Sequence, residues 1–462
     1  MTSLPENKAL PNTSCEDSDH TIAACPGCDL LLVVSSIPNG HYLACSRCGT
    51  TISKTYQNSI NRVLTLSFTG LLLYLPAMLL PLMTLSSIGF DESGSVLDTC
   101  MNFYRNGYYF VAVMVFFTAV VFPFLKLFLP FVISLYIKLN RRPGWLKSGF
   151  RFLGHLEEWG MVEVYLLGIL ITLIKMNDMA SIDYNTGFFC FIALVMITMA
   201  TSVNLDRNLF WALIDSSQTD MTRKTLNGIK TKLQENPEYI LTAMQSGFIR
   251  CHDCGNLIST EQNDQATQPK CPRCQASVHQ RTKNSIPRTW ALVITSFILF
   301  IPANTFPIMR VDFLGVPENS TILDGILYFF NDGSYGIGII ILTASILVPL
   351  FKIVGLIIIL LTIKSGKNHF LKQKATMFRF IEFIGRWSML DIFVIALLTV
   401  MVDFGFLTST HTAPGATYFC IVVAATMTAA IVFDPRIMWD RCASPATDAI
   451  SLRETYAPTD GS

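Results

Sequence analysis

The sequence predicts an all-α polytopic membrane protein, built as a tandem duplication of a four-helix transmembrane module with a small β domain before each copy. Three observations lead to this fold class: long apolar segments, a repeat at a fixed offset, and paired cysteines. Of the 462 residues, 51% are hydrophobic and only 15% are charged, whereas about 25% are charged in an average soluble domain. The formal net charge of +1 gives no reason to expect a nucleic-acid partner.

The duplication appears as residues that recur 226 positions later. The cysteine set Cys25, Cys28, Cys45 and Cys48 returns as Cys251, Cys254, Cys271 and Cys274. The same offset relates Asn58 to Asn284, Pro76 to Pro302, Pro81 to Pro307, Asp98 to Asp324, and Lys126 to Lys352. After two inserted residues, Trp159 corresponds to Trp387 and Glu163 to Asp391. The chain therefore contains two copies, at about 20–206 and 246–435.

Each copy contains four apolar segments. They lie at 62–84, 107–138, 159–176 and 186–205 in the first copy, and at 288–308, 333–363, 387–403 and 415–433 in the second. The second segment of each copy exceeds the roughly 20 residues that span a bilayer, and its prolines predict a kinked or tilted helix. Paired prolines near the end of each first segment predict that this end is broken or unwound.

Charges in the connecting segments predict the orientation. The segments 138–157 and 364–386, expected to be loops, are rich in lysine and arginine, whereas the loops at the opposite ends lean acidic. Under the positive-inside rule the basic loops are cytoplasmic. An even number of helices in each copy then places both termini and both cysteine sets in the cytoplasm, with eight transmembrane helices in all. The polar N-terminal segment has no apolar core typical of a signal peptide.

The expected domain order follows from these boundaries. It comprises a disordered N-terminus (1–20), a first ribbon (21–56), a first transmembrane module (57–206), a partly helical cytoplasmic connector (207–245), a second ribbon (246–282), a second transmembrane module (283–435) and a cytoplasmic tail (436–462).

The eight repeated cysteines are predicted to bind two structural Zn²⁺ ions. In each copy, two CxxC pairs are separated by 16 residues, the spacing at which four thiolates surround one zinc in a zinc ribbon. The stretch Leu30–Leu43 has the composition of a short hairpin. A closed four-sulfur site stabilises a domain too small for its own core. A redox function of the CxxC pairs is the alternative.

Several charged residues within the apolar segments are candidates for transport. Lys126 and Lys352 occupy equivalent positions in the long second segments, where a lysine costs about 2.5–3.5 kcal/mol at the bilayer centre. They either extend to the cytoplasmic headgroups or face a polar cavity. Glu163 and Asp391 are either their partners or ordinary interfacial carboxylates.

Another group of charges breaks the repeat. Lys175 and Asp178 lie three residues apart at the outer end of the third segment, and Asp403 occupies the position that corresponds to Lys175 in the second copy. These charges either meet between the modules or are exposed at helix ends. The chain contains none of the common nucleotide-binding or hydrolase motifs, so no catalytic residue is assigned and an enzyme is not indicated.

The chain resembles the paraquat-inducible protein A family. The resemblance rests on the two sets of cysteine pairs, on 301–309 (IPANTFPIM) and 333–352 (GSYGIGIIILTASILVPLFK), and on 385–398 (GRWSMLDIFVIALL) and 433–441 (FDPRIMWDR). It implies a bacterial inner-membrane protein that loads or receives lipids, chiefly phospholipids, at the base of a periplasmic tunnel formed by a partner with MCE domains. A structural anchor for that partner, without transport, and a membrane thiol oxidoreductase are the alternatives.

Overall fold

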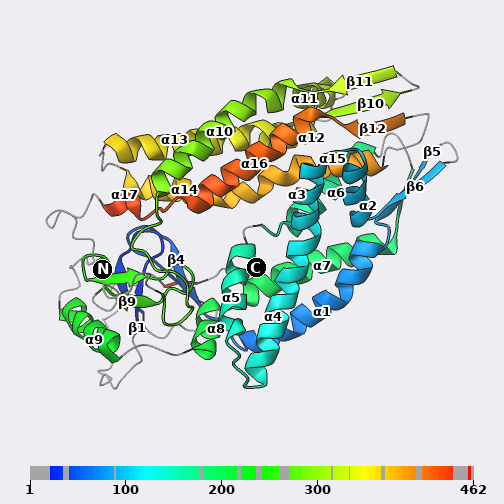
Figure 1. Ribbon diagram of the computed structural model, residues 1–462. Coiled ribbons are helices and arrows are strands. Elements are labelled where there is room, and N and C mark those ends of the chain that lie inside the picture. The colour runs from blue at the N-terminus through cyan, green and yellow to red at the C-terminus, as the bar shows by residue number, and fades with distance from the viewer. Residues whose placement is uncertain are drawn as a thin grey trace, which may run out of the picture.

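The computed structural model describes residues 21–34, 41–87, 90–157, 159–176, 181–215, 220–235, 242–260, 270–313, 316–331, 333, 335–365, 370–401, 408–440 and 456–458. Two membrane modules pack together at one end of the molecule and diverge toward the other, where both cysteine-bearing ribbons lie (Figure 1). We call these the sheet end, after two small sheets located there, and the ribbon end.

The two modules have the same order of elements. The first contains α1 (Ser59–Leu79), β5 (Met83–Ser87), β6 (Phe90–Gly94), α2 (Val96–Arg105), α3 (Tyr109–Val115), the π-helical turn η1 (Phe116–Val121), α4 (Phe122–Lys138), α5 (Trp145–Leu156), α6 (Val162–Met176), β7 (Ser181–Tyr184) and α7 (Thr186–Asn204). The second contains α10 (Ser285–Thr305), β10 (Met309–Phe313), β11 (Val316–Ser320), α11 (Ile322–Asn331), α12 (Tyr335–Leu342), the π-helical turn η2 (Thr343–Leu347), α13 (Val348–Ser365), α14 (Leu371–Gly385), the 3-10 turn η3 (Arg386–Met389), α15 (Leu390–Met401), β12 (Thr408–Thr412) and α16 (Pro414–Val432).

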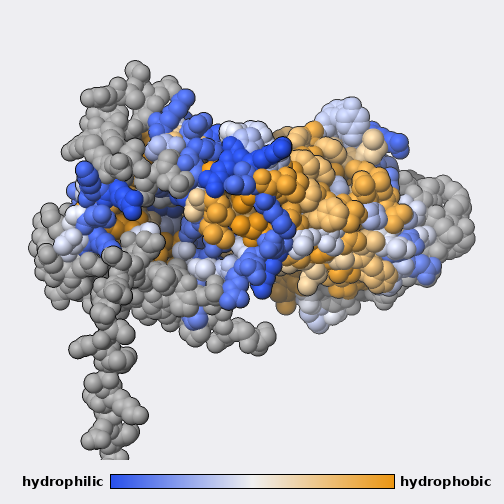
Figure 2. Space-filling model, turned by 90° about the horizontal axis from the view of Figure 1, so that it is seen from below, coloured by the Kyte–Doolittle hydropathy of each residue, from blue (hydrophilic) through white to orange (hydrophobic). Residues whose placement is uncertain are grey.

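Six helices in the described part of the chain are long and apolar enough to cross a membrane: 59–79, 109–138, 186–204, 285–305, 338–365 and 414–432. They correspond to the first, second and fourth apolar segments of each copy. On the face shown in Figure 2, apolar side chains cover much of the helical part, whereas many hydrophilic residues lie nearer the ribbon end. The surface therefore fits a membrane protein.

The third segment of each copy differs from the sequence-based expectation. α6 has 15 residues and α15 has 12, which corresponds to roughly 18–23 Å, less than the hydrocarbon thickness of about 30 Å. α5 precedes α6, and α14 precedes α15. Both lie in segments that we expected to be loops, so that expectation is wrong. α5 buries one face, with Leu146, Phe150 and Leu153, and its other face carries both polar and aromatic residues. Because the helix is short and contains several basic residues, its sequence looked like that of a loop.

The kinks predicted in the long second segments are π-helical turns. The backbone N–H of Phe122 donates to the carbonyl of Phe117, and that of Val348 donates to the carbonyl of Thr343, five residues back in each case. Pro123 and Pro349 follow directly. Because a proline has no N–H and its ring clashes with the carbonyl four residues earlier, the widened turn accommodates it without ending the helix.

The first helix of each module is not broken at its inner proline, contrary to our expectation. α1 continues through Pro76 to Leu79, and α10 continues through Pro302 to Thr305. The chain leaves the helix just before Pro81 in the first module and Pro307 in the second. A proline near the end of a helix removes only one hydrogen bond, and the packing of α1 on α7 and of α10 on α16 maintains the last turn.

Two three-stranded antiparallel sheets lie at the sheet end, with strand orders β6-β5-β7 and β11-β10-β12. The sequence analysis did not anticipate them, so the membrane modules are not entirely α-helical. Each sheet is followed by a capped helix. Ser95 and Asp98 form a capping box at the start of α2, and Thr321 and Asp324 exchange the equivalent hydrogen bonds at the start of α11. This explains why the repeat retains Asp98 and Asp324.

A serine at the start of each module joins its first helix to its fourth. The Ser59 hydroxyl donates to the carbonyl of Asn204 at 2.6 Å and accepts from the N–H of Asp206. Ser285 makes the same two contacts with Val432 and Asp434. These hydrogen bonds close the ribbon end of each module and explain the repeated Asn-Ser-Ile sequence.

The ribbons and connector complete the chain. The first ribbon contains β1 (Thr21–Ala24), β2 (Leu31–Val34), β3 (His41–Ala44) and β4 (Thr51–Lys54), and the second contains β8 (Phe248–Arg250) and β9 (Leu257–Ser259). The predicted Leu30–Leu43 hairpin is wrong, because β2 pairs with β1 and β3 pairs with β4. The remaining elements are α8 (Arg207–Ile214), α9 (Asp220–Glu235), α17 (Ile437–Asp440) and β13 (Tyr456–Pro458), which pairs with β3.

We predict that Gly415→Ala destabilises the second module. A Cβ atom at Gly415 would lie 2.5 Å from the carbonyl oxygen of Pro307, which already accepts the Gly415 N–H. Relieving this backbone overlap separates α16 from the end of α10 and costs about 1–3 kcal/mol. The measurement is the thermal unfolding midpoint in detergent. Gly325→Ala is the control, because it too replaces a helical glycine but has open space around it; equal midpoints for the two variants would contradict the prediction.

Candidate functional site

The eight repeated cysteines form two separate clusters at the ribbon end. In each cluster the four Sγ atoms lie within 4.8 Å of one another, and all four residues are buried. Cys25 and Cys48 are 3.4 Å apart, and Cys251 and Cys274 are 3.5 Å apart, measured between sulfur atoms. Four thiolates around one metal at about 2.3 Å would be separated by about 3.8 Å. The donor set and its geometry therefore suit two tetrahedral metal sites.

Each ribbon packs on the membrane module of the other copy. The first ribbon shares a buried apolar cluster with α13, α14 and α17 of the second module, including Leu356, Phe378 and Trp439. The Arg47 guanidinium lies 4.5 Å from the centre of the Trp439 ring, where it makes a cation–π contact. The second ribbon is buried against Phe150 of α5 and against α8. This exchange crosslinks the two modules.

The ribbons also contact each other. Thr242, just before the second ribbon, forms a β-bridge with Leu30 of the first, and the N–H of Ala243 donates to the carbonyl of Asp29 at 2.9 Å. Leu31 and Phe248 share a small apolar cluster with α9. The two metal clusters and both ribbon–module interfaces therefore belong to one packed assembly.

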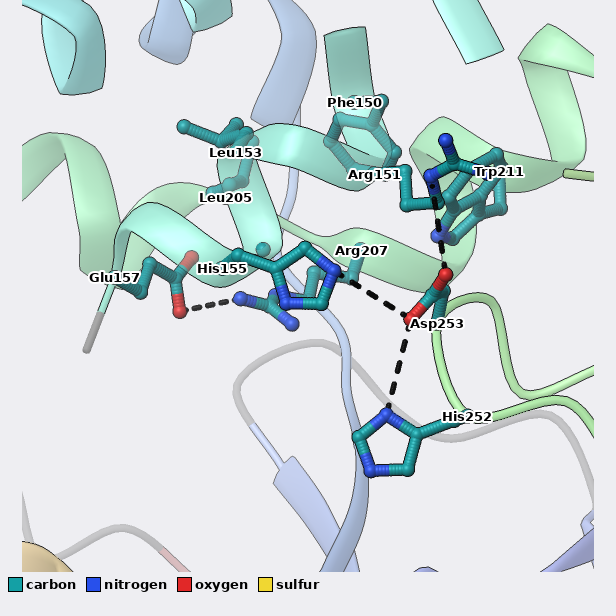
Figure 3. A pocket seen from close by; sticks show the side chains of 11 residues that line it. Phe150, Arg151, Leu153, His155, Glu157, Leu205, Arg207, Trp211, His252 and Asp253 are labelled. Atoms are coloured by element: carbon teal, nitrogen blue, oxygen red, sulfur yellow. Dashed lines mark ion pairs between the residues drawn. The ribbon is translucent and has the colours of Figure 1, made fainter. Parts of the chain in front are cut away.

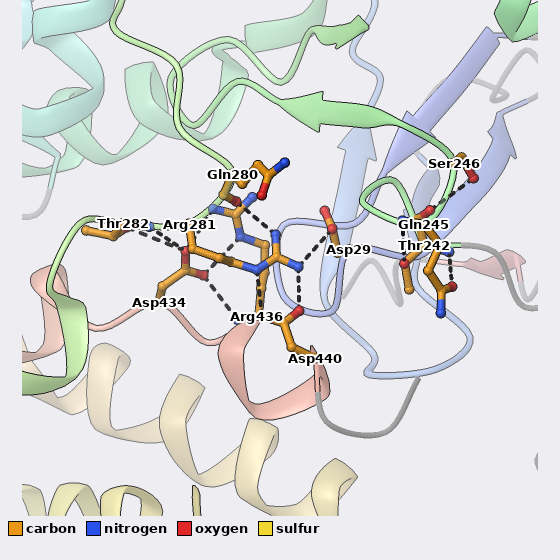
Figure 4. Close-up of polar contacts among 10 residues, drawn as sticks. All are labelled: Asp29, Thr242, Gln245, Ser246, Gln280, Arg281, Thr282, Asp434, Arg436 and Asp440. Atoms are coloured by element: carbon orange, nitrogen blue, oxygen red, sulfur yellow. Dashed lines mark hydrogen bonds and ion pairs between the residues drawn. The ribbon is translucent and has the colours of Figure 1, made fainter. Parts of the chain in front are cut away.

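A half-buried arginine joins the ribbons to the end of the second module (Figure 4). Arg281, at the end of the second ribbon, donates to Asp29 of the first ribbon at 3.0 Å and to Asp440 of α17. Although burial by itself lowers the pKa of Arg281, the two carboxylates raise it above its ordinary value. The Asp29 side chain is 3% exposed, so Arg281 provides its counter-charge.

A second buried ion pair lies beside this network. Arg436 donates to both carboxylate oxygens of Asp434, at 2.9 and 2.8 Å. Burial raises the pKa of Asp434, but the Arg436 guanidinium outweighs burial and holds it below its usual range. The first module has Asp206 at the equivalent place, where it caps α8, and burial raises the pKa of that carboxyl group. We did not single out Arg281, Asp434 or Arg436 from the sequence, although the 433–441 motif contains two of them.

Lys126 and Lys352 both reach the junction that precedes the third helix of their module. The Lys126 ammonium donates to the carbonyl of Gly160 at 2.8 Å, and the fully buried Lys352 donates to the Ser388 hydroxyl at 3.3 Å. Gly160 and Ser388 are equivalent, 228 positions apart. In the first module this junction separates α5 from α6; in the second it is the η3 turn. Each lysine therefore links the helix that contains the π-helical turn to the junction before the third helix of its module, α6 or α15.

The other predicted transport residues are only partly described. Glu163 is half-buried in the first turn of α6. Lys175 lies in the last turn of α6 and Asp391 lies in α15, but their side chains are outside the described part of the structure. Asp178 and Asp403 lie outside the described residues altogether. The pairing of Glu163 and Asp391 with the lysines, and that of Lys175 with Asp403, remain predictions.

A small cavity of about 110 Å³ lies between α5, α8 and the second ribbon (Figure 3). Asp253 points into it, with Arg151, His155 and His252 at 3.9, 3.8 and 3.7 Å. Arg207 pairs with Glu157 on the opposite side. These contacts link the basic residues of the 138–157 segment to the ribbon, which confirms that both lie on one side of the membrane helices.

A cleft of about 770 Å³ lies between the ribbons and the two modules. Its membrane wall consists of the ribbon ends of α7 and α16, and β4, α14 and the second ribbon form the remaining walls. Basic and acidic side chains both line it: Lys54, Arg207, Arg250, Arg379, Arg436, Asp206, Asp253, Glu382 and Asp434. The cleft was not predicted, because its walls come from five distant parts of the sequence.

Comparison with known protein families finds a match to both modules. The paraquat-inducible protein A family matches residues 60–215 and 286–443. The chain belongs to the paraquat-inducible protein A family. It is 30% identical to the intermembrane transport protein PqiA of Escherichia coli over 421 residues, covering 90% of this chain and 95% of that protein.

Two further relatives of the family align over nearly the whole chain. The lipophilic envelope-spanning tunnel protein A of Escherichia coli is 30% identical over 418 residues, which is 90% of each chain. A probable intermembrane transport protein of Haemophilus influenzae is 27% identical over 433 residues, covering 93% of this chain and 98% of that protein. No solved structure matched the chain. Two of these three relatives are named as intermembrane transport proteins and the third as an envelope-spanning tunnel protein.

The two cysteine clusters predict two metal ions per chain. Cys271→Ser is expected to reduce the metal content from two ions to one, because three thiolates no longer close a tetrahedral site. The measurement is elemental analysis of the purified protein. Cys190→Ser is the control, since Cys190 lies in α7 outside both clusters. Equal metal content in wild type and Cys271→Ser would contradict the assignment.

Arg281→Ala is expected to lower the free energy of unfolding by about 3–5 kcal/mol, because Asp29 is left buried without its counter-charge. Chemical denaturation in detergent measures the effect. Arg310→Ala removes an ion pair with Asp312 on an exposed strand and is expected to cost under about 1 kcal/mol. Similar losses in the two variants would show that Arg281 does not hold the ribbons together.

Proposed function

We propose that this protein is the inner-membrane component of a system that moves lipids, chiefly phospholipids, across the bacterial envelope. The observation that carries the proposal is the alignment over about nine-tenths of the chain with relatives named as intermembrane transport proteins. The family relationship, the six apolar helices and the lack of a recognisable catalytic motif support a transport component rather than an enzyme.

The proposed orientation places the ribbon end in the cytoplasm and the sheet end in the periplasm. The basic segments contact the ribbons, and the opposite loops lean acidic, so the positive-inside rule supports this assignment. In this topology there are eight crossings, as expected from the sequence. The third crossing is proposed to be α6 in the first module and α15 in the second, both short for a bilayer, and the amphipathic helices α5 and α14 precede them on the cytoplasmic side.

The metal in the ribbons is proposed to be Zn²⁺ in a structural role. Four thiolates complete a tetrahedral shell and leave no position for substrate. The residues that would hold it are those of the two clusters, and the ion would stabilise ribbons that have almost no core of their own. A four-sulfur metal site in each ribbon disfavours the thiol oxidoreductase alternative, because the same thiols would have to be free.

The lipid path is proposed to pass the junctions that precede α6 and α15. Lys126 and Lys352 provide positive charge there, and discontinuous helices with freed backbone groups are where many transporters bind substrate. Glu163 and Asp391 are proposed to face the same region from α6 and α15. Lys175, Asp178 and Asp403 are proposed to act nearer the sheet end, where lipid would pass to a periplasmic partner with MCE domains.

A structural anchor is the competing proposal. In that case the protein would only seat the partner, and the sheets β6-β5-β7 and β11-β10-β12 would carry the whole function. The buried lysine favours transport, because a fully buried charge costs free energy that an anchor does not need.

Lys352→Met distinguishes the two proposals. We expect the variant to be at least as stable as wild type, because methionine removes a buried charge, yet to retain several-fold less co-purified phospholipid and to fail in restoring lipid transport to cells that lack the gene. Lipid mass spectrometry and a complementation assay measure these effects. Lys364→Met is the control, since Lys364 is an exposed lysine on the same helix. Full activity of Lys352→Met would favour the anchor.

A further inference from the structure

The cleft between the ribbons has a surplus of cationic groups. Its four carboxylates already have contacts within the protein: Asp434 binds Arg436, Asp206 caps α8, Asp253 faces Arg151 and two histidines, and Glu382 also makes an interaction. Within the described residues, no carboxylate lies within ion-pair distance of Arg250 or Lys54. The cleft therefore contains two cations that make no ion pair with a carboxylate of the described residues, and one of them, Arg250, adjoins Cys251 of the second cysteine cluster.

Arg436 adds a donor without an acceptor. Arg436 is 4% exposed, and its Nε and Nη2 groups both donate hydrogen bonds to Asp434. In the described part of the chain Nη1 is buried and has no hydrogen-bond partner. A buried N–H group left without an acceptor is unfavourable by about 1–3 kcal/mol. Arginine lines sites for phosphate groups because its several N–H donors match their oxygens.

Arg250 and Arg436 both line the cleft, so two guanidinium groups of like charge share one space. An anion between them would offset their mutual repulsion.

The membrane wall of the same cleft is apolar. Val203 of α7 is 57% exposed and Ile431 of α16 is 41% exposed, and both line the cleft. They are equivalent residues, 228 positions apart, so the two modules contribute matching apolar surfaces at their fourth helices. A ligand that satisfies both walls has an anionic head and an apolar chain.

We propose that this cleft binds the headgroup of an anionic phospholipid, with the phosphate between Arg250, Arg436 and Lys54 and an acyl chain along Val203 and Ile431. The site lies on the ribbon side of the lysine junctions and is separate from them. The inference rests on the proposed function only in taking a phospholipid as the ligand. Both modules and both ribbons contribute to it, so binding there requires the assembled ribbon end.

The test is calorimetric titration of the full chain, reconstituted in nanodiscs of phosphatidylcholine, with the short-chain lipid dihexanoyl phosphatidylglycerol. Glycerol phosphate and dihexanoyl phosphatidylcholine are titrated in parallel. We expect saturable binding of the phosphatidylglycerol, with ~tenfold weaker binding of the other two, since one lacks the apolar chain and the other lacks net negative charge. Glycerol phosphate that binds as tightly as the lipid would overturn the proposal in favour of a soluble phosphate ester.

Variants locate the site. Arg250→Gln is expected to weaken binding ~tenfold or more, and Lys54→Gln, at an exposed rim position, to weaken it several-fold. Ile431→Ser should weaken binding of the lipid without changing that of glycerol phosphate. Arg310→Gln, on β10 at the sheet end, is the matched control. The metal content of each variant shows that the ribbons remain folded.

Lipid binding in the cleft can be measured separately from transport. Lys352→Met should bind the short-chain lipid as wild type does, even though we expect its transport to fail. If Arg250→Gln and Lys54→Gln bind the lipid as tightly as Arg310→Gln does, with metal content intact, the cleft is not the site. If the wild-type protein shows no saturable binding, the inference is overturned. The proposed function is then still tested separately by Lys352→Met.

Discussion

The arrangement of the whole ribbon end depends on one constraint: a ribbon of fewer than about forty residues cannot bury enough apolar surface to be stable alone. A four-sulfur metal site supplies part of the missing stability, and the rest comes from packing on membrane helices. Here each ribbon packs on the module of the other copy, with Trp439 and Phe378 contacting the first ribbon, and Phe150 and Trp211 the second. The modules also meet directly, chiefly through α6 with α15 and α2 with α15. The exchange of ribbons therefore fixes their separation at the ribbon end and creates the cleft.

The duplicated modules share a scaffold but differ in their polar chemistry. The structural positions are retained in both copies: the serine that joins the first and fourth helices, the glycine that lets the fourth helix approach the end of the first, and the capped helix after each sheet. The polar positions differ. Asp206 caps a helix whereas Asp434 binds an arginine, and Asn208 occupies the position that corresponds to Arg436. The cationic side of the cleft therefore comes largely from one copy.

The two repeated lysines make corresponding contacts in their modules. Lys126 and Lys352 join the helix that contains the π-helical turn to the junction before the third helix of the module. The π-helical turn leaves backbone groups outside the regular α-helical pattern. Between the modules, Tyr165 packs edge-to-face against Phe393, and Gly168 packs closely on the same phenylalanine. The modules are therefore in closest contact between α6 and α15.

The sequence by itself determined the duplication, six of the membrane helices and both sets of metal ligands, because each depends on local spacing or on long uniform hydrophobicity. It did not reveal α5 or α14, whose amphipathic pattern was obscured by basic residues, nor the sheets, each of which joins a short hairpin to a third strand 90 or more residues away. The exchange of ribbons, the Arg281 network and the cleft were decided only by tertiary structure. Each requires side chains from several distant segments to meet, and neither spacing nor hydropathy contains that information.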